Sequence, residues 1–131
     1  MNSFQIRISD EVGTALSQHK PVVALESTIF SHLGLPSPAN FEALTRCTAA
    51  LRSHGVVPAI TAVLDGVARV GIDESEWPLI LGPAKKVGER ELATAMAQRW
   101  AVGATTVSSS LLLAARAGIR VFSTGGIGGV H

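Results

Sequence analysis

Two apolar runs separated by only two residues constrain the fold more than any other feature of the chain. Residues 56–64 and 67–72 are rich in β-branched side chains, and Asp65 and Gly66 lie between them. An Asp-Gly pair between strand-like runs is typical of a tight β-hairpin, because both residues tolerate the positive φ angles of its turn. We therefore predict two antiparallel strands in the middle of the chain.

Helix-like and strand-like patterns alternate through the rest of the sequence. Apolar side chains at helical spacing predict helices over 9–18, 38–54, 89–100 and 108–117. Short apolar runs predict further strands over 21–25, 104–107 and 119–122. This alternation predicts a single domain over residues 1–131 with an α/β layered fold and one hairpin.

Several helix boundaries carry their own signals. Ser37 followed by Pro38 predicts a helix start with the serine as N-cap, and Gly55 predicts the end of the same helix. Asp73, with Glu76 three residues later, resembles the capping box of a short helix.

The composition is that of a folded domain, and it excludes several classes of protein. Hydrophobic residues make up 47% of the 131 residues and charged residues 16%, which excludes a disordered tail. The net charge is +1 and the basic residues are scattered, so we expect no nucleic-acid partner. No apolar run approaches the roughly 18 residues that span a bilayer, so we expect no membrane partner. The single Cys47 fits a reducing compartment, and a cytoplasmic location is expected.

Glu26 is the first candidate functional residue, because it directly follows the apolar strand predicted over 21–25. In parallel α/β sheets the carboxyl ends of the strands face the ligand crevice. A carboxyl group there tends to have a raised pKa, which suits a general acid. The alternative is a charged residue at the point where a strand meets solvent.

Two further segments could bind an anion. Residues 105–108 lie between a predicted strand and a predicted helix, where free backbone N–H groups bind phosphate, although Ser108 also fits a plain N-cap. Residues 125–129 could cradle an anion with backbone amides or form a flexible glycine turn. The histidines show no metal-ligand spacing, so a zinc site is not expected.

Three stretches of the chain together resemble one known family. They are residues 24–29 (Ala-Leu-Glu-Ser-Thr-Ile), 103–107 (Gly-Ala-Thr-Thr-Val) and 117–131, which end in Ser-Thr-Gly-Gly-Ile-Gly-Gly-Val-His. In order and spacing they resemble the N-terminal portion of the pseudouridine-5′-phosphate glycosidases, the family that includes the indigoidine synthase A-like proteins. The resemblance covers nearly the whole chain from Pro21 onward, but only part of the longer family chain.

The resemblance implies a homotrimeric enzyme with an α/β/α layered sandwich fold and a manganese ion. It implies the reversible cleavage of the C-glycosidic bond of pseudouridine 5′-phosphate to uracil and ribose 5-phosphate. Because carbon is a poor leaving group, the family captures the opened sugar as an imine on a lysine, while a glutamic acid transfers protons.

The resemblance also implies roles for individual residues. The proton-donor glutamate of the family corresponds to Glu26, and two substrate-contacting residues correspond to Lys86 and Val107. Thr106, at the same strand-to-helix junction as Val107, is a further substrate-binding candidate.

Two parts of this correspondence are open or fall outside the chain. Lys85 remains an alternative to Lys86, because Gly88 stands where the family usually has serine. The metal-binding aspartate and the imine-forming lysine of the family correspond to positions beyond His131.

Two functions therefore remain possible from the sequence. The chain could be part of a C-glycosidase whose lysine and aspartate come from another segment. It could instead be an inactive fragment that retains weak phosphate-sugar binding or an assembly role. For the isolated chain we expect no turnover, because loss of a covalent nucleophile normally removes most of the acceleration. We also expect the strand over 119–122 to lie at an exposed sheet edge and to promote self-association.

Overall fold

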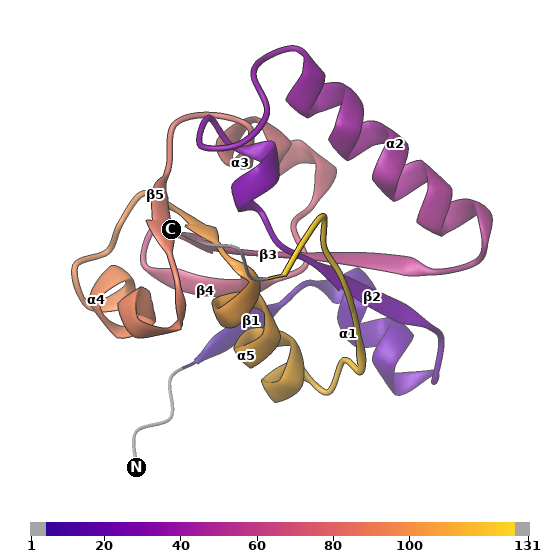
Figure 1. Ribbon diagram of the computed structural model, residues 1–131. Coiled ribbons are helices and arrows are strands. Elements are labelled where there is room, and N and C mark those ends of the chain that lie inside the picture. The colour runs from indigo at the N-terminus through magenta and orange to yellow at the C-terminus, as the bar shows by residue number, and fades with distance from the viewer. Residues whose placement is uncertain (1–4, 128–131) are drawn as a thin grey trace.

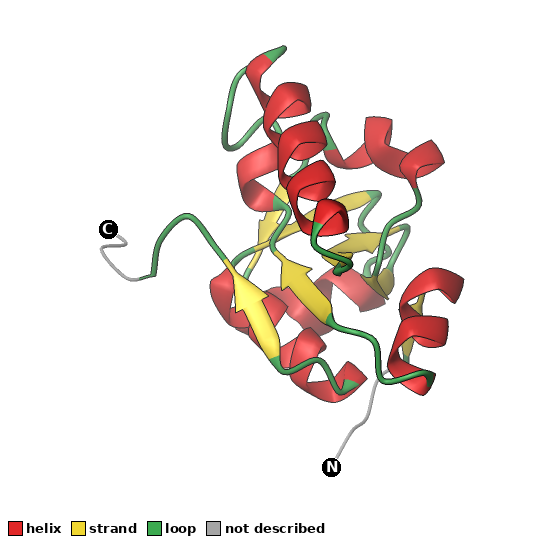
Figure 2. Ribbon diagram, turned by 90° about the vertical axis from the view of Figure 1, so that its right-hand side faces the viewer, coloured by secondary structure: helices red, strands yellow, loops and turns green. Residues whose placement is uncertain are grey.

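The structure is a computed structural model that describes residues 5–127. Its sheet lies between two groups of helices (Figures 1 and 2). The strands are β1 Ile6–Ile8, β2 Val22–Leu25, β3 Val57–Leu64, β4 Val67–Val70, β5 Lys85–Val87, β6 Val102–Thr105 and β7 Val121–Ser123. The helices are α1 Asp10–Ser17, α2 Ala39–Ser53, α3 Trp77–Ile80, α4 Leu92–Ala97 and α5 Val107–Ala117. Short 3₁₀ turns cover Thr28–Phe30, Glu74–Glu76 and Glu89–Glu91.

The predicted hairpin is confirmed. Strands β3 and β4 pair antiparallel, with Leu64 opposite Val67, so that the loop contains only Asp65 and Gly66. Both loop residues have positive φ angles, 48° for Asp65 and 75° for Gly66. Glycine is required at the second position for another reason as well, because an added Cβ would lie 2.8 Å from the Cα of Arg99.

Strand β3 is the centre of a mixed sheet. Its first half pairs in parallel with β2, from Val22 opposite Val57 to Leu25 opposite Ile60. Its second half pairs antiparallel with β6 and, on the other edge, with β4. Strand β7 adds in parallel to β2, β5 adds in parallel to β6, and β1 adds in parallel to β4.

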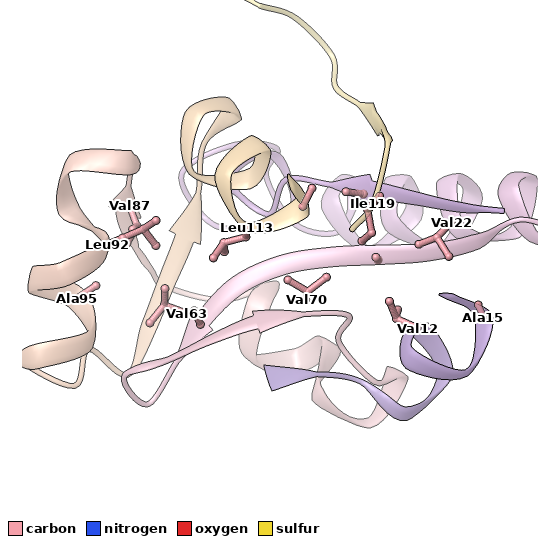
Figure 3. Close-up of a cluster of buried hydrophobic side chains, with 14 residues drawn as sticks. Val12, Ala15, Val22, Val63, Val70, Val87, Leu92, Ala95, Leu113 and Ile119 are labelled. Carbon is pink, nitrogen blue, oxygen red and sulfur yellow. The ribbon is translucent and has the colours of Figure 1, made fainter. Parts of the chain in front are cut away.

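Each face of the sheet has its own apolar core. Side chains that alternate along β3 point to opposite faces, so Val63 joins one core while Ile60 and Leu64 join the other. Helices α1, α4 and α5 cover the first core (Figure 3), and α2 and α3 cover the second. The predicted α/β/α layered sandwich is therefore confirmed.

Strand β7 lies at an edge of the sheet as the structure describes it. It pairs with β2 alone among residues 5–127, and 56% of the surface of Val121 is exposed. The edge expected near residues 119–122 is thus present, three residues long and displaced by one to two positions. Self-association through it stays a prediction.

One predicted helix start is displaced, and another lacks its predicted side-chain cap. Helix α2 begins at Ala39, its N-cap position is Pro38 and no side chain caps it, so Ser37 is not the cap. Asp73 is the N-cap of the short 3₁₀ turn Glu74–Glu76, as expected, but its side chain makes no capping hydrogen bond. The Glu76 carboxylate also pairs with Arg69, a tertiary contact that the local sequence does not indicate.

Other boundaries also differ from the sequence prediction. The helix expected over 89–100 is a 3₁₀ turn followed by the short α4, and it ends before Gln98. The last long helix, α5, starts at Val107, and its N-cap is Thr106 rather than Ser108. The sequence analysis did not predict β1 or β5, which are only three residues long and pair with distant segments. No helix of residues 5–127 is long and apolar enough to cross a membrane.

Candidate active site

A cleft of about 530 Å³ opens where β2, β5 and β6 end and α5 begins. Its walls come from segments that are far apart in the sequence. The lining residues are Glu26, Thr28, Lys86, Gly88, Thr106, Val107, Ser108, Leu111 and Gly126. The cleft therefore brings together all four residues that the sequence analysis selected, namely Glu26, Lys86, Thr106 and Val107. Ser108 belongs to the segment 105–108 that was predicted to bind an anion, whereas Thr28 and Leu111 were not selected as site residues.

Glu26 follows β2 directly and is half-buried in the cleft wall. Burial raises the pKa of the Glu26 carboxyl, and a hydrogen bond from Thr124 opposes that shift. The Thr124 Oγ1 donates to Glu26 Oε1 at 3.2 Å. Among residues 5–127, Glu26 takes part in no ion pair, so no cation holds its pKa down. The geometry suits a carboxyl group that keeps its proton to a higher pH than usual.

The structure separates the two adjacent lysines. Successive side chains of a strand point to opposite faces, so Lys85 and Lys86 of β5 diverge. The Lys85 ammonium lies over the Trp100 ring, 4.8 Å from its centroid. Lys86 lines the cleft with Glu26. Of the two lysines, Lys86 is therefore the one that lines the cleft, and its substrate-binding role stays a prediction.

The start of α5 forms another part of the cleft wall. Thr106 is the N-cap, and its backbone N–H donates to the Ser109 Oγ at 2.9 Å. The Ser108 Oγ accepts from the backbone N–H of Glu89 at 3.0 Å, which ties α5 to the segment that follows β5. The first backbone N–H groups of a helix have no partner within the helix and carry a partial positive charge. The start of α5 is thus suited to a phosphate or carboxylate.

Gly88 lies between Lys86 and α5. Its backbone N–H donates to Glu91 Oε1 at 2.9 Å. Its φ angle is −86°, so the backbone itself would accept a side chain. An added Cβ would lie 3.0 Å from Glu91 Oε1 and 3.6 Å from the Ser108 Oγ. A side chain at this position would therefore crowd the Glu91 carboxylate and stand beside the Ser108 hydroxyl.

The glycine-rich segment closes the cleft near Glu26. Gly126 lines the cleft, and its backbone N–H donates to the Thr124 Oγ1 at 3.3 Å. Thr124 therefore links this segment to Glu26, a contact that the sequence analysis did not predict. Residues 128 and 129, the last part of the predicted anion-binding segment, lie outside the described residues.

A second, smaller cavity of about 230 Å³ shares Glu26 with the cleft. Its lining is mainly apolar, with Ile29, Phe30 and Ala43 from the segment after β2 and from α2. Cys47 and Thr124 complete the wall around the carboxyl group. Glu26 thus lines both the cleft and this mainly apolar cavity.

The described residues do not form a metal site. Among residues 5–127, no three His, Cys, Asp or Glu side chains are grouped closely enough to hold an ion. The manganese ion that the resemblance implies therefore has no ligand set in this part of the chain.

The fold and the cleft define a three-layer α/β/α protein with a site at the carboxyl ends of its strands. Comparison with known proteins agrees with that class. The sequence profile of the family described as indigoidine synthase A-like protein matches residues 11–131. This chain therefore belongs to the indigoidine synthase A-like family.

Curated relatives and solved structures are similar over the whole chain. The chain is 53% identical to a pseudouridine-5′-phosphate glycosidase of Streptomyces griseus, over 99% of this chain and 40% of the relative. It is 50% identical to one of Rhodospirillum centenum, over 100% and 40%. It also superimposes on the prealnumycin C-glycosynthase AlnA, solved with ribulose 5-phosphate, with a TM-score of 0.83 and 36% identity over 99% of this chain and 42% of that one. An indigoidine synthase A-like protein of Thermotoga maritima gives a TM-score of 0.83 at 34% identity, over 100% and 44%. The chain spans about 40% of the length of these curated relatives.

Proposed function

We propose that this chain forms the acid side and the phosphate side of a pseudouridine-5′-phosphate glycosidase site. The observation that supports this most strongly is the single cleft that contains Glu26, Lys86, Thr106 and Val107. These residues come from β2, β5 and the start of α5, so the cleft depends on the folded domain.

Glu26 is the proposed proton donor. Cleavage of a C-glycosidic bond leaves the base with an electron pair on carbon, which must be protonated as the bond breaks. A carboxyl group whose pKa is raised by burial holds its proton to a higher pH than an ordinary glutamate does, and it can deliver that proton to the leaving base. The apolar cavity on the other side of Glu26 is a suitable place for a flat pyrimidine ring.

Lys86 and the start of α5 are the proposed phosphate site. An ammonium group and the free backbone N–H groups of a helix N-terminus both favour a dianionic phosphate. The hydroxyls of Thr106 and Ser108 line the same wall and can donate to its oxygens. The complex of AlnA, a relative of this fold, with ribulose 5-phosphate supports a sugar phosphate as the ligand class.

Turnover requires two groups that the resemblance assigns to positions beyond residue 131. The imine-forming lysine would supply the electron sink, and the aspartate would hold the manganese ion. We therefore propose that this chain acts only together with a segment that carries both, and that a trimer is the assembled form.

The test is a complementation assay. This chain is incubated with pseudouridine 5′-phosphate and Mn²⁺, alone and with the segment of the Streptomyces griseus relative that follows the matched part. We expect uracil release from the mixture and none from either piece. No uracil from the mixture, with both pieces folded and associated, would contradict the proposal.

A second candidate function is sugar-phosphate binding without catalysis. The lack of a metal-ligand cluster among residues 5–127 favours it for the isolated chain. Titration with ribose 5-phosphate, followed by ¹⁵N NMR, should then shift the Val107 and Ser108 amides. A stable adduct trapped by borohydride from ribose 5-phosphate and this chain alone would contradict the non-catalytic function.

A further inference from the structure

Two strands that run toward each other end at the same point of β3. Strand β4 occupies one edge of β3 along Thr61–Leu64, so β6, which pairs with the same stretch, lies on the other edge. Past the end of β4, the backbone N–H of Gly71 donates to Ile60 O on the β4 edge, so β2 shares the edge of β6. Strand β2 ends with Leu25 opposite Ile60, and β6 arrives from the other direction with Ala104 opposite Ala62. Thr61 therefore faces the junction of the two strand ends.

Buried hydroxyl groups fill this junction. We call Ser27, Thr61, Thr105 and Ser110 the hydroxyl cluster, and none of the four is more than 1% exposed. The Oγ1 atoms of Thr61 and Thr105 lie 2.9 Å apart, and the Ser110 Oγ lies 2.8 Å from that of Thr61. Ser27 joins through Thr105, whose backbone N–H donates to the Ser27 Oγ at 2.9 Å.

Between the end of β2 and the end of β6, the backbone hydrogen bonds along this edge of β3 are interrupted. The hydroxyl cluster supplies hydrogen bonds in their place. The Thr61 Oγ1 donates to Leu25 O at 3.1 Å, and the Thr105 Oγ1 donates to Thr61 O at 2.8 Å. A hydroxyl has one proton, so Thr61, which donates to Leu25, must accept the hydrogen bond from Ser110. Thr61 thus contacts the end of β2, the end of β6 and helix α5 with one side chain and its own carbonyl.

The residues that Thr61 holds directly precede the cleft residues. Leu25 precedes Glu26, and Thr105 precedes Thr106, the N-cap of α5. Thr61 itself is fully buried and does not line the cleft. Its hydrogen bonds, together with those that Ser27 and Thr28 make directly to Thr105, therefore hold Glu26 and the start of α5 at a set spacing.

We propose that Thr61 is a positioning residue, which fixes the distance between Glu26 and the start of α5 through the hydroxyl cluster. This proposal rests on the proposed function, because the distance between Glu26 and the start of α5 matters for catalysis only if both contact the substrate. A valine at this position keeps the shape of threonine but leaves Leu25 O and the Ser110 hydroxyl without their partner. The direct hydrogen bonds of Ser27 and Thr28 to Thr105 then hold the two strand ends with less support.

The test compares Thr61→Val and Thr61→Ser with the control Thr48→Val. Thr48 is also a buried threonine, but its Oγ1 donates to Leu44 O within α2, away from the cleft. The first measurement is the pKa of Glu26, from the pH dependence of its carboxyl ¹³C shift. Lys86 is the one other Asp, Glu, Lys, Arg or His side chain on the described lining of the cleft. The second measurement is the affinity for ribose 5-phosphate.

In Thr61→Val we expect the pKa of Glu26 to fall toward its ordinary value and the affinity to fall about tenfold, the scale on which small displacements act. Thr61→Ser should restore both, and Thr48→Val should change neither. Equal changes in Thr61→Val and Thr48→Val, or no rescue by serine, would overturn the proposal.

Two further outcomes are possible, namely that the wild-type chain does not bind the ligand and that Thr61→Val does not fold. If the wild-type chain binds no ribose 5-phosphate, the proposed function fails, while the pKa comparison still decides the role of Thr61. If Thr61→Val does not fold, the variant Ser110→Ala is used in its place. Ser110→Ala removes the hydroxyl that donates to Thr61 but keeps the Thr61 side chain. A Glu26 pKa that is unchanged in Ser110→Ala would then overturn the proposal.

Discussion

Glu26 and Glu76 are both partly buried glutamates, and their surroundings give them opposite properties. Glu76 receives two hydrogen bonds from the Arg69 guanidinium, at 2.7 and 3.0 Å, and these hold the pKa of its carboxyl below the ordinary value. Glu26 has a threonine hydroxyl at 3.2 Å, and burial raises the pKa of its carboxyl. The same side chain is thus a stabilising anion in one place and a candidate acid in the other.

The comparison indicates that Glu76 stabilises the fold, whereas Glu26 is a candidate for chemistry. The Arg69 side chain is 8% exposed and needs the Glu76 carboxylate to compensate its buried charge. Glu26 has no such role, since no buried cation depends on it among the described residues. Replacement of each glutamate should therefore affect a different property.

The largest effect is expected for Glu26→Gln in the complemented mixture. The amide has the shape of the protonated acid but cannot give up a proton, so uracil release should fall about a thousandfold. The unfolding free energy should stay within about 0.5 kcal/mol of wild type. The rate of uracil formation measures the first property, and urea denaturation measures the second. Wild-type activity in the Glu26→Gln mixture would contradict the role of Glu26 as the proton donor.

The next largest effect is expected for Glu76→Gln. Loss of the carboxylate leaves the buried Arg69 charge uncompensated and should lower the unfolding free energy by about 3 kcal/mol. The matched control is Glu11→Gln, because the Arg52–Glu11 pair has similar geometry but is half-exposed on both sides. That control should cost less than about 1 kcal/mol. Equal losses in urea denaturation would show that burial does not distinguish the two pairs.

A smaller effect is expected for Lys86→Met, which removes the cation from the wall opposite Glu26. Binding of ribose 5-phosphate should weaken about tenfold, as for the loss of one charged contact to phosphate. Lys85→Met is the control, since Lys85 lies over Trp100 and away from the cleft. Isothermal titration calorimetry on both variants would contradict the assignment if Lys85→Met weakened binding more.

The sequence predicted those parts of the molecule that local chemistry determines. Asp65 and Gly66 predict the hairpin, because the φ angles of a two-residue turn permit few other residues. Gly118, at φ 87°, likewise marks the end of α5. Glu26 was found because a charge directly after an apolar strand is unusual, and the family resemblance supplied Lys86, which composition alone would leave on the surface.

The parts that the sequence did not predict depend on distant partners. Strand β5 consists of two lysines and a valine, and it is a strand only because β6 pairs with it. Asp73 and Glu76 have the spacing of a capping box, but the Asp73 side chain makes no capping hydrogen bond and the Glu76 carboxylate forms a salt bridge with Arg69 of β4. Thr61 looks like one more β-branched residue of an apolar strand. Its role is visible only when β2 and β6 meet beside it.

The smallest effect is expected in the pH dependence of stability, where the two glutamates should act with opposite signs. A carboxyl whose pKa is raised in the folded state holds its proton more tightly there than in the unfolded chain. Its contribution to stability is complete below the ordinary glutamate pKa and is lost as the pH rises through the raised value. The contribution of Glu76, whose pKa is lowered, is complete above the ordinary value and is lost as the pH falls through the lowered one.

The measurement is urea denaturation from pH 3 to 7. As the pH rises, the unfolding free energy of Glu26→Gln should increase relative to wild type, and that of Glu76→Gln should decrease relative to wild type. Parallel curves for the two variants would mean that burial at Glu26 does not favour its protonated form.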